Sequence, residues 1–287
     1  MRYAEGRFSS ARLAFGHGTH NALEEAVWLL VHVLKIDFED VQGAAERVLD
    51  EPSAREALRL IERRVRTRKP LAYILREAWL AGIRFYVDER VIVPRSFIAE
   101  LLPDGLSPWL PRRGVKQVLD LCTGSGCLAV LAARAFPGSR LVAADISGAA
   151  LAVAERNVSD HRLRSRISLV KSDLFASVPR RQYDLIVSNP PYVAVSAMRR
   201  LPAEHRHEPR LALAAGRDGL DAVMRIIGAA AGFLGPRGVL VVEVGRNRKA
   251  LERRCPRLGF TWLNTSAGDE MVWLLTREQL PAAQTTG

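Results

Sequence analysis

The 287-residue chain has a globular composition, with 48% hydrophobic and 25% charged residues, which argues against intrinsic disorder. It contains no run of about 18 consecutive apolar residues and no N-terminal apolar segment with a cleavage site, so we expect neither a membrane span nor a secretory signal. Its three cysteines, Cys122, Cys127 and Cys255, are too few for a disulfide framework and are typical of a reducing, cytoplasmic compartment.

The net charge of +11 lies mainly in the second part of the chain. Residues 1–114 carry a net charge of +2, and residues 115–287 carry +9. Such an excess makes an acidic partner such as nucleic acid plausible. However, arginine supplies 37 of the 42 basic residues, and a GC-rich coding genome produces the same bias without any selection for binding. The charge alone therefore leaves RNA binding open.

Helical periodicity characterises the first 77 residues. Capping signals at Asn21–Glu24 and Ser53–Glu56 predict two helices, and Pro70 ends the second helical segment. The first helix is expected to use an apolar face made of Leu23, Val27, Leu30, Val31 and Leu34. The second has a basic face, which we interpret as solvated with an RNA surface as the alternative: Arg55, Arg59, Arg63, Arg64, Arg66, Arg68 and Lys69.

Residues 78–114 are predicted to form a β-hairpin and a linker. Residues 78–93 are rich in β-branched and aromatic side chains, and Val87–Arg90 has the composition of the hairpin turn. A short helix is expected after Ser96. Three prolines and two glycines within residues 103–114 then indicate a linker.

Beyond residue 115, strand and helix patterns alternate. Strands are expected at 115–121, 140–145, 167–171, 183–188, 238–244, 259–264 and 271–275, and helices near 127–136, 147–158 and 218–234. This alternation predicts an α/β fold with a doubly wound, mostly parallel sheet that can end in an antiparallel hairpin. Ligands of such sheets bind at the carboxyl ends of the strands, where the motifs below occur.

A loop of small residues follows the first of these strands. Gly124 and Gly126 permit tight turns and close approach of a ligand, and the helix after them favours a carboxylate or phosphate. A Gly-x-Gly pair is weak evidence by itself, since it serves a dinucleotide or only a tight turn. The full dinucleotide fingerprint fails because Ala129 stands at the third glycine position.

Aspartates occur at the ends of the next two strands. Asp145 has the position of a carboxylate that accepts hydrogen bonds from both ribose hydroxyls of a nucleoside. It could instead cap the following helix, a role for which Ser147 competes. Asp173 could accept a hydrogen bond from an adenine amino group while Leu174 covers the ring, and a loop-capping role is the alternative. Together with the glycine loop, the pattern favours a nucleoside ligand.

The tetrapeptide Asn189-Pro190-Pro191-Tyr192 directly follows the strand at 183–188 and is the most specific motif in the chain. Its two prolines make the turn rigid and favour extended backbone just before it. The amide oxygen of Asn189 and the carbonyl of Pro190 can then converge on one substrate NH2 group, while Tyr192 flanks a planar group. The motif therefore predicts a site for an amino group.

Candidate metal ligands are sparse. Cys122 and Cys127 lack the two further ligands that a zinc site needs. His205 and His207 lie in an arginine-rich loop, where such a pair is more typical of solvated side chains. We interpret this loop as a substrate-facing rim, whose charge could meet RNA or an acidic part of a substrate complex.

Together, these motifs resemble the amino-group class of S-adenosylmethionine (SAM)-dependent methyltransferases over residues 115–275. The resemblance implies a Rossmann-like class I methyltransferase domain that uses SAM and no metal. It implies catalytic roles for Asn189, Pro190 and Tyr192, and substrate contacts from Asn189, Pro190, Pro191, Tyr192 and Glu208. It also implies SAM contacts from Asp120, Cys122, Thr123, Gly124, Ser125, Gly126, Asp145, Asp173, Leu174 and Asn189.

The glutamine branch of this class, the HemK/PrmC-like protein N(5)-glutamine methyltransferases, is the more similar. Its members have a small helical domain and a hairpin linker that ends in Val-Pro-Arg-Ser, here Val93–Ser96. Gly16–Asn21, Phe85–Arg90 and Arg206–Pro209 are similar to the PrmB type, which acts on the third large-subunit ribosomal protein. This resemblance implies a substrate-recognition domain (1–77), a hairpin and linker (78–114) and a catalytic domain (115–287).

The expected reaction is methyl transfer from SAM to a glutamine amide nitrogen, with S-adenosylhomocysteine as the other product. The expected partner is the ribosomal protein, either free or in an assembly intermediate with ribosomal RNA. Three alternatives stay open: a peptide chain release factor as substrate, an adenine amino group in DNA or RNA, and a non-enzymatic RNA-binding protein. If the domains are independent, a fragment that starts near Leu110 should bind SAM without methylating a protein.

Overall fold

The N-terminal part of the chain is helical, as predicted. The computed structural model describes residues 1–44, 47–111 and 114–282, so residues 112–113 of the predicted linker and 283–287 of the predicted catalytic domain lie outside it. The helices of this part are α1 (Arg2–Ser10), α2 (Ala22–Leu34), η1 (Phe38–Asp40), α3 (Val41–Ala44), α4 (Glu51–Thr67) and α5 (Leu71–Leu75).

The predicted cap of α2 is confirmed, and that of α4 is wrong. The Asn21 side chain accepts a hydrogen bond of 2.9 Å from the Glu24 backbone N–H, as a capping signal requires. In α4 the N-cap is Asp50, whose carboxylate accepts from the backbone N–H of Ser53 at 2.9 Å. The helix starts earlier than predicted because Asp50 caps it and Pro52 is tolerated in a first turn.

The faces of both helices agree with the prediction only in part. On α2, Val31 is buried as expected, but Leu23 is 47% exposed, and Ala26, Trp28 and Leu29 are buried as well. On α4, Arg64 was expected in solvent but is 1% exposed, because it forms an ion pair with the buried Glu25 of α2. A buried guanidinium needs such a partner, and the partner lies on another helix, where sequence spacing does not show it.

The predicted hairpin is present, but its turn is elsewhere. Strands β1 (Ala78–Leu80) and β2 (Ile83–Phe85) pair antiparallel around Ala81 and Gly82. Both turn residues have positive φ, +49° and +72°, which is the geometry that matches the twist of a two-residue hairpin. The prediction of a turn at Val87–Arg90 is therefore wrong, and α6 (Ile98–Leu101) follows as expected.

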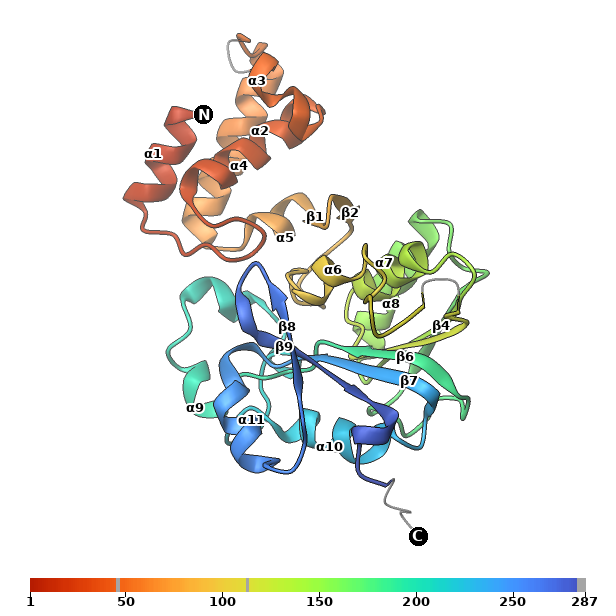
Figure 1. The fold of residues 1–287 in the computed structure, drawn as a ribbon. Helices are drawn as coiled ribbons and strands as arrows, with labels where there is room; N and C mark the ends of the chain where they lie inside the picture. The colour runs from red at the N-terminus through yellow and green to blue at the C-terminus, as the bar shows by residue number, and fades with distance from the viewer. Residues whose placement is uncertain (45–46, 112–113, 283–287) are drawn as a thin grey trace.

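The remaining chain forms the predicted doubly wound α/β domain (Figure 1). Its seven strands have the order β5-β4-β3-β6-β7-β9-β8, and the first five are parallel. The strands are β3 (Gln117–Leu121), β4 (Arg140–Asp145), β5 (Ile167–Lys171), β6 (Tyr183–Ser188), β7 (Leu234–Glu243), β8 (Thr261–Thr265) and β9 (Gly268–Thr276). The helices are α7 (Cys127–Ala135), α8 (Gly148–Asp160), α9 (Val195–Met198), α10 (Asp221–Ala230) and α11 (Arg248–Arg254). Strand β9 pairs antiparallel with β7 and β8, which confirms the expected terminal hairpin.

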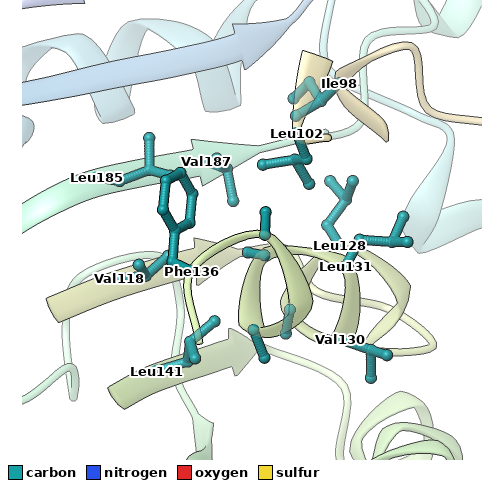
Figure 2. Close-up of a cluster of buried hydrophobic side chains, with 14 of the residues drawn as sticks. Ile98, Leu102, Val118, Leu128, Val130, Leu131, Phe136, Leu141, Leu185 and Val187 are labelled. Carbon is teal, nitrogen blue, oxygen red and sulfur yellow. The ribbon is translucent and has the colours of Figure 1, made fainter. Parts of the chain in front are cut away.

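The linker packs into the core of this α/β domain. Ile98 and Leu102 of the α6 region lie beside Leu128 and Leu131 of α7 and belong to one buried cluster with β6 (Figure 2). In turn, Ala150 and Val153 of α8, which belong to the predicted catalytic domain, are part of the buried cluster of the N-terminal helices. Hydrophobic burial is therefore continuous across the predicted boundaries, so we expect the parts to stabilise one another.

Short single-turn helices complete the chain. They are η2 (Ala203–His207), η3 (Arg210–Ala212), η4 (Gly245–Asn247) and η5 (Arg277–Gln279). Among the residues that the structure describes, no helix combines the length and the apolar character that a membrane crossing needs.

Candidate active site

A cavity of about 330 Å³ opens at the carboxyl ends of β3, β4, β5 and β6. This is the edge where parallel α/β sheets bind ligands. Predicted cofactor residues that line it are Cys122, Gly124, Asp145, Asp173, Leu174 and Asn189. The structure thus brings together residues from four separate strand ends.

The glycine loop after β3 borders the cavity through Gly124, whereas Gly126 does not line it. Gly124 and Gly126 have φ of +56° and +78°, a region in which side chains other than glycine are strained. A Cβ on Gly126 would lie 3.1 Å from the Cβ of Ala154, so glycine also permits α7 and α8 to approach. Thr123 and Ser125 are buried and do not line this cavity.

Asp145 is held by backbone donors and faces the cavity. One carboxylate oxygen accepts from the Gly124 N–H at 2.9 Å, and the other accepts from the Ser147 N–H at 2.8 Å. Ser147 itself caps α8, since its side chain accepts from the Ala150 N–H at 3.2 Å. The capping role therefore belongs to Ser147, while burial raises the pKa of Asp145. The remaining lone pairs of Asp145 are available for hydroxyl donors.

Asp120 lies beneath the loop and is fully buried. One oxygen accepts from the Thr123 hydroxyl at 2.5 Å, and the other has no hydrogen-bond partner among the described residues. Burial raises the pKa of Asp120 to about 7, in spite of the Thr123 hydrogen bond. Asp120 and Thr123 connect the end of β3 to the glycine loop, so we infer that both residues support this loop.

Asp173 and Leu174 form the part of the wall expected to face adenine. Leu174 is buried, whereas Asp173 is exposed and forms a two-point ion pair with Arg225 of α10, at 2.9 Å for each contact. Arg225 also lines the cavity and was not singled out from the sequence. An amino group at Asp173 would therefore share the carboxylate with this guanidinium.

Asn189 lines two adjoining cavities. The second cavity, of about 190 Å³, is lined by Pro190, Tyr192 and Arg95, together with Asn189 itself. Pro191 lines only the first cavity. The tetrapeptide therefore separates a larger cavity on the glycine-loop side from a smaller one with an aromatic wall. A group that reacts across this boundary would meet the Asn189 side chain.

Tyr192 is held in place by three residues of β7 and η4 that sequence analysis did not select. Its hydroxyl donates to Oε1 of the buried Glu243 at 3.2 Å, and its carbonyl accepts from the Asn247 side chain at 2.8 Å. A Cβ on Gly245 would lie 2.7 Å from the Tyr192 ring, so the ring packs on bare backbone. The sequence signal that could have pointed to Glu243 is its position, as an acidic residue at the end of the strand predicted at 238–244.

Glu243 also reaches the linker. Its second oxygen accepts from the Ser96 hydroxyl at 2.7 Å and from the Phe97 N–H at 2.9 Å. Burial raises the pKa of Glu243 to about 7, although its three hydrogen bonds favour the charged form. This carboxyl group therefore connects the Val-Pro-Arg-Ser segment with the tetrapeptide turn.

Glu208, the predicted substrate contact, lines neither cavity. Its buried carboxylate is paired with Arg95 and lies 3.0 Å from Nδ1 of His205 and 3.4 Å from Nε2 of His17. Burial opposes ionisation, but the hydrogen bonds from His17, His205 and Arg95 lower the pKa of Glu208 well below its usual value. His17, His205 and Glu208 have the spacing of metal ligands, yet Arg95 already neutralises the carboxylate. We therefore propose that Glu208 supports the cavity wall through Arg95.

Residues of the hairpin and linker region complete both cavities, and the N-terminal part binds a residue next to the smaller one. Arg90, Val91 and Ile92 line the first cavity, and Ile92 and Arg95 line the second. The buried Glu204 of η2 accepts from the Ala14 N–H at 3.0 Å and forms an ion pair of 2.7 Å with Arg68. Sequence reasoning placed residues 90–95 outside the site because they precede residue 115, and it did not select Glu204.

Two protein families match the chain. The Methyltransferase small domain family matches residues 104–204, and the PrmC N-terminal domain family matches residues 7–75. The chain is 50% identical to the ribosomal protein uL3 glutamine methyltransferase of Burkholderia pseudomallei, over 98% of this chain and 94% of the relative. It is 51% identical to the protein of the same name from Neisseria gonorrhoeae, with the same two coverages.

Solved structures share the fold at low sequence identity. The catalytic domain of human Mettl16, solved with a hairpin of the MAT2A 3′UTR, has a TM-score of 0.53 at 17% identity, over 79% of this chain and 81% of that one. A methyltransferase from Pyrococcus furiosus has a TM-score of 0.51 at 15% identity, over 69% and 90% of the two chains. These similarities concern the α/β methyltransferase fold.

Proposed function

Because the chain belongs to the family of ribosomal protein uL3 glutamine methyltransferases, we propose that it methylates a glutamine side-chain amide in uL3, the third large-subunit ribosomal protein. The observation that carries this proposal is the position of Asn189, which lines both the larger and the smaller cavity. The larger cavity would hold SAM, and the smaller one would hold the glutamine.

The residues of the larger cavity fit SAM. Asp145 keeps lone pairs for the ribose hydroxyls, because each of its oxygens accepts only one backbone hydrogen bond. Leu174 and Ile146 provide apolar wall for a purine, and Asp173 provides an acceptor beside them. The glycine loop leaves space for close approach of the ligand at Gly124. When bound, SAM supplies a methyl group on a sulfonium, which is already a good leaving group.

The chain must then position a poor nucleophile. The lone pair of an amide nitrogen is delocalised into its carbonyl, so catalysis depends on orientation, which contributes up to ~7–11 kcal/mol in favourable systems. Asn189 Oδ1 and the Pro190 carbonyl would accept the two amide hydrogens and aim the lone pair towards the larger cavity. Both acceptors would also stabilise the positive charge that develops on nitrogen. A proton can leave after the transfer, without a histidine base.

Tyr192 would flank the planar amide, and its supports would keep the turn rigid. The hydrogen bonds with Glu243 and Asn247 and the contact with Gly245 restrain both ends of this residue. The restraint matters because a displacement of about 1 Å at a reacting centre costs up to ~10²-fold in rate. We therefore assign Glu243 and Asn247 to positioning.

We further propose that residues 1–77 recognise the protein substrate, that residues 115–287 provide the catalytic centre, and that the reaction takes place in the cytoplasm. The helical part carries no glycine loop and no tetrapeptide of the kind found after residue 115. Its Ala14 and Arg68 bind the buried Glu204, which directly precedes His205 of the smaller cavity. Binding of the substrate by residues 1–77 could therefore be coupled to the geometry of the smaller cavity.

The test of the function offers three substrates in parallel with labelled SAM: purified uL3, a class I release factor and a DNA duplex. We expect label in a single glutamine of uL3, located by mass spectrometry, and no label in its Gln→Ala variant. Preferential labelling of the release factor would assign the chain to the sister activity. Label in DNA, with both proteins blank, would overturn the glutamine assignment.

A further inference from the structure

The segment between α9 and α10 separates its charges between an inner and an outer side. Two of its three acidic residues, Glu204 and Glu208, are buried and paired with basic residues from earlier in the chain, and the third, Asp218, pairs with Arg254 of α11. Its arginines are all exposed, and we call them the arginine rim: Arg199, Arg200, Arg206, Arg210 and Arg217. Within the described part of the chain, no ion pair or side-chain hydrogen bond involves any of the five.

Four arginines of the rim are sequence neighbours of residues that line the two cavities. Arg200 precedes Leu201 and Arg206 follows His205, and both of these neighbours line the smaller cavity. Likewise, Arg210 lies between Pro209 and Leu211, and Arg217 follows Gly216, all of which line the larger cavity. In Figure 1 this teal segment projects beside the sheet, below the N-terminal helices. The unpaired positive charge therefore lies close to both cavities.

We propose that the arginine rim binds the phosphate backbone of RNA, so that the enzyme recognises uL3 in contact with ribosomal RNA. The proposal rests on the function proposed above, because it names the form of that substrate. A guanidinium matches a phosphate with two parallel hydrogen bonds, and five unpaired guanidinium groups at one opening form a strong phosphate-binding surface.

The side chains between the arginines favour contact with backbone rather than bases. Leu211, the exposed large apolar residue between the arginines, is aliphatic and offers no ring on which a base could stack, and the half-buried imidazole of His207 lies against the Thr67 carbonyl at 3.2 Å. Recognition would then depend on charge and be insensitive to RNA sequence. The conformation of the segment is already fixed from inside, since Glu204 and Glu208 anchor it to Arg68 and Arg95.

The first experiment measures RNA affinity against salt concentration, by fluorescence anisotropy of a short labelled RNA hairpin. Each phosphate contact contributes about 0.7–0.9 to the slope of log K against log salt, so five contacts predict a slope of about −3.5 to −4.5. Replacing all five rim arginines with glutamine should remove most of this slope. The pair Arg199→Gln and Arg200→Gln should lower it by about 1.4–1.8, which gives a milder variant if the fivefold variant does not fold.

A matched control removes the same charge elsewhere. Lys116, Arg140, Arg162, Arg181 and Arg237 are exposed, form no ion pair among the described residues, and lie at or before the N-terminal ends of the parallel strands. Replacing these five with glutamine should leave the slope nearly unchanged. An equal loss in the control, or a rim variant with wild-type affinity, would overturn the proposal.

The second experiment compares two forms of the substrate. We expect the wild type to methylate uL3 bound to an rRNA fragment with a kcat/KM about tenfold above that for uL3 alone, and the rim variant to lose this preference. Polyglutamate that competes better than RNA would overturn the proposal in favour of an acidic protein partner. Absence of glutamine label in uL3, both alone and bound to the rRNA fragment, would contradict the proposed function. The anisotropy measurement would still test RNA binding by the arginine rim independently.

Discussion

The hydroxyl of Tyr192 donates a hydrogen bond of 3.2 Å to Oε1 of Glu243, a carboxyl group that is fully buried at the end of β7. The contact joins the tetrapeptide turn after β6 to the neighbouring strand. The other carboxylate oxygen of Glu243 accepts from Ser96 and Phe97, so a single carboxyl group connects the linker, the sheet and the turn. Its protonation state therefore affects three elements of the site.

Replacement of Glu243 by glutamine should alter the pH dependence of stability. Burial raises the pKa of Glu243 from 4.5 to about 7, so the folded state holds this proton more tightly than the unfolded state. The associated stability is fully present below about pH 4.5 and is lost progressively as the pH rises to about 7. The loss amounts to roughly 3 kcal/mol, because one pKa unit corresponds to about 1.4 kcal/mol.

Denaturant unfolding of wild type and Glu243→Gln at a series of pH values measures this effect. We expect the difference in unfolding free energy to shift in favour of the variant between pH 4.5 and 7, since the amide cannot ionise. A difference that stays constant across that range would show that Glu243 does not titrate there.

Replacement of Asp145 by alanine should weaken SAM binding. The expected loss is at least ~1–3 kcal/mol, the effect of removing charge-assisted hydrogen bonds to the ribose. Asp145→Asn serves as the matched variant, because it keeps a similar size and one acceptor oxygen. Calorimetry should rank the affinities as wild type, then Asn, then Ala, and unchanged affinity in both variants would remove Asp145 from the ribose role.

Replacement of Asn189 by alanine should reduce the rate more than it reduces cofactor affinity. Loss of a preorganised polar group at a reacting centre lowers kcat by roughly 10²–10³. Single-turnover kinetics with labelled SAM and uL3 would measure the rate, and calorimetry would measure SAM affinity. Near-normal turnover in this variant would assign the turn a structural role only.

A fragment that starts near Leu110 should lose SAM affinity. If the catalytic domain were independent, the fragment would keep its SAM binding. However, the fragment lacks Arg90, Val91 and Ile92, which line the larger cavity. Such a fragment would also expose the apolar surface that packs against residues 98–102. Calorimetry of the fragment beside the full chain decides between the two expectations, with circular dichroism to establish whether the fragment folds.

Replacement of Glu204 by glutamine should destabilise the chain and raise the KM for the protein substrate. Breaking a buried ion pair from one side costs up to ~3–5 kcal/mol, because the opposite charge loses its partner. Arg68 is partly exposed, so we expect a value near the lower end or below it. Adding Arg68→Gln should recover part of the stability, and a strictly additive double variant would contradict the coupling.

The sequence by itself determined the α/β domain and the place of its site. Strands at 140–145, 167–171 and 183–188 were predicted with the bounds that the structure has, because their stretches of mainly apolar residues end at Asp145, Lys171 and Ser188. Residues that follow consecutive parallel strands necessarily meet at one edge of a sheet. The meeting of Gly124, Asp145 and Asn189 at one cavity follows from this local pattern.

Only the tertiary structure decided which polar groups are buried and what they contact. Arg64 and Glu208 have the local sequence of solvated residues, yet each is buried because its partner lies on an element distant in the chain. From the sequence, Glu243 is only the end of a strand, and the tertiary structure shows that Tyr192 and Ser96 bind its carboxyl group. Periodicity reports how one element faces the core, whereas a buried charge depends on long-range pairing, which no single segment contains.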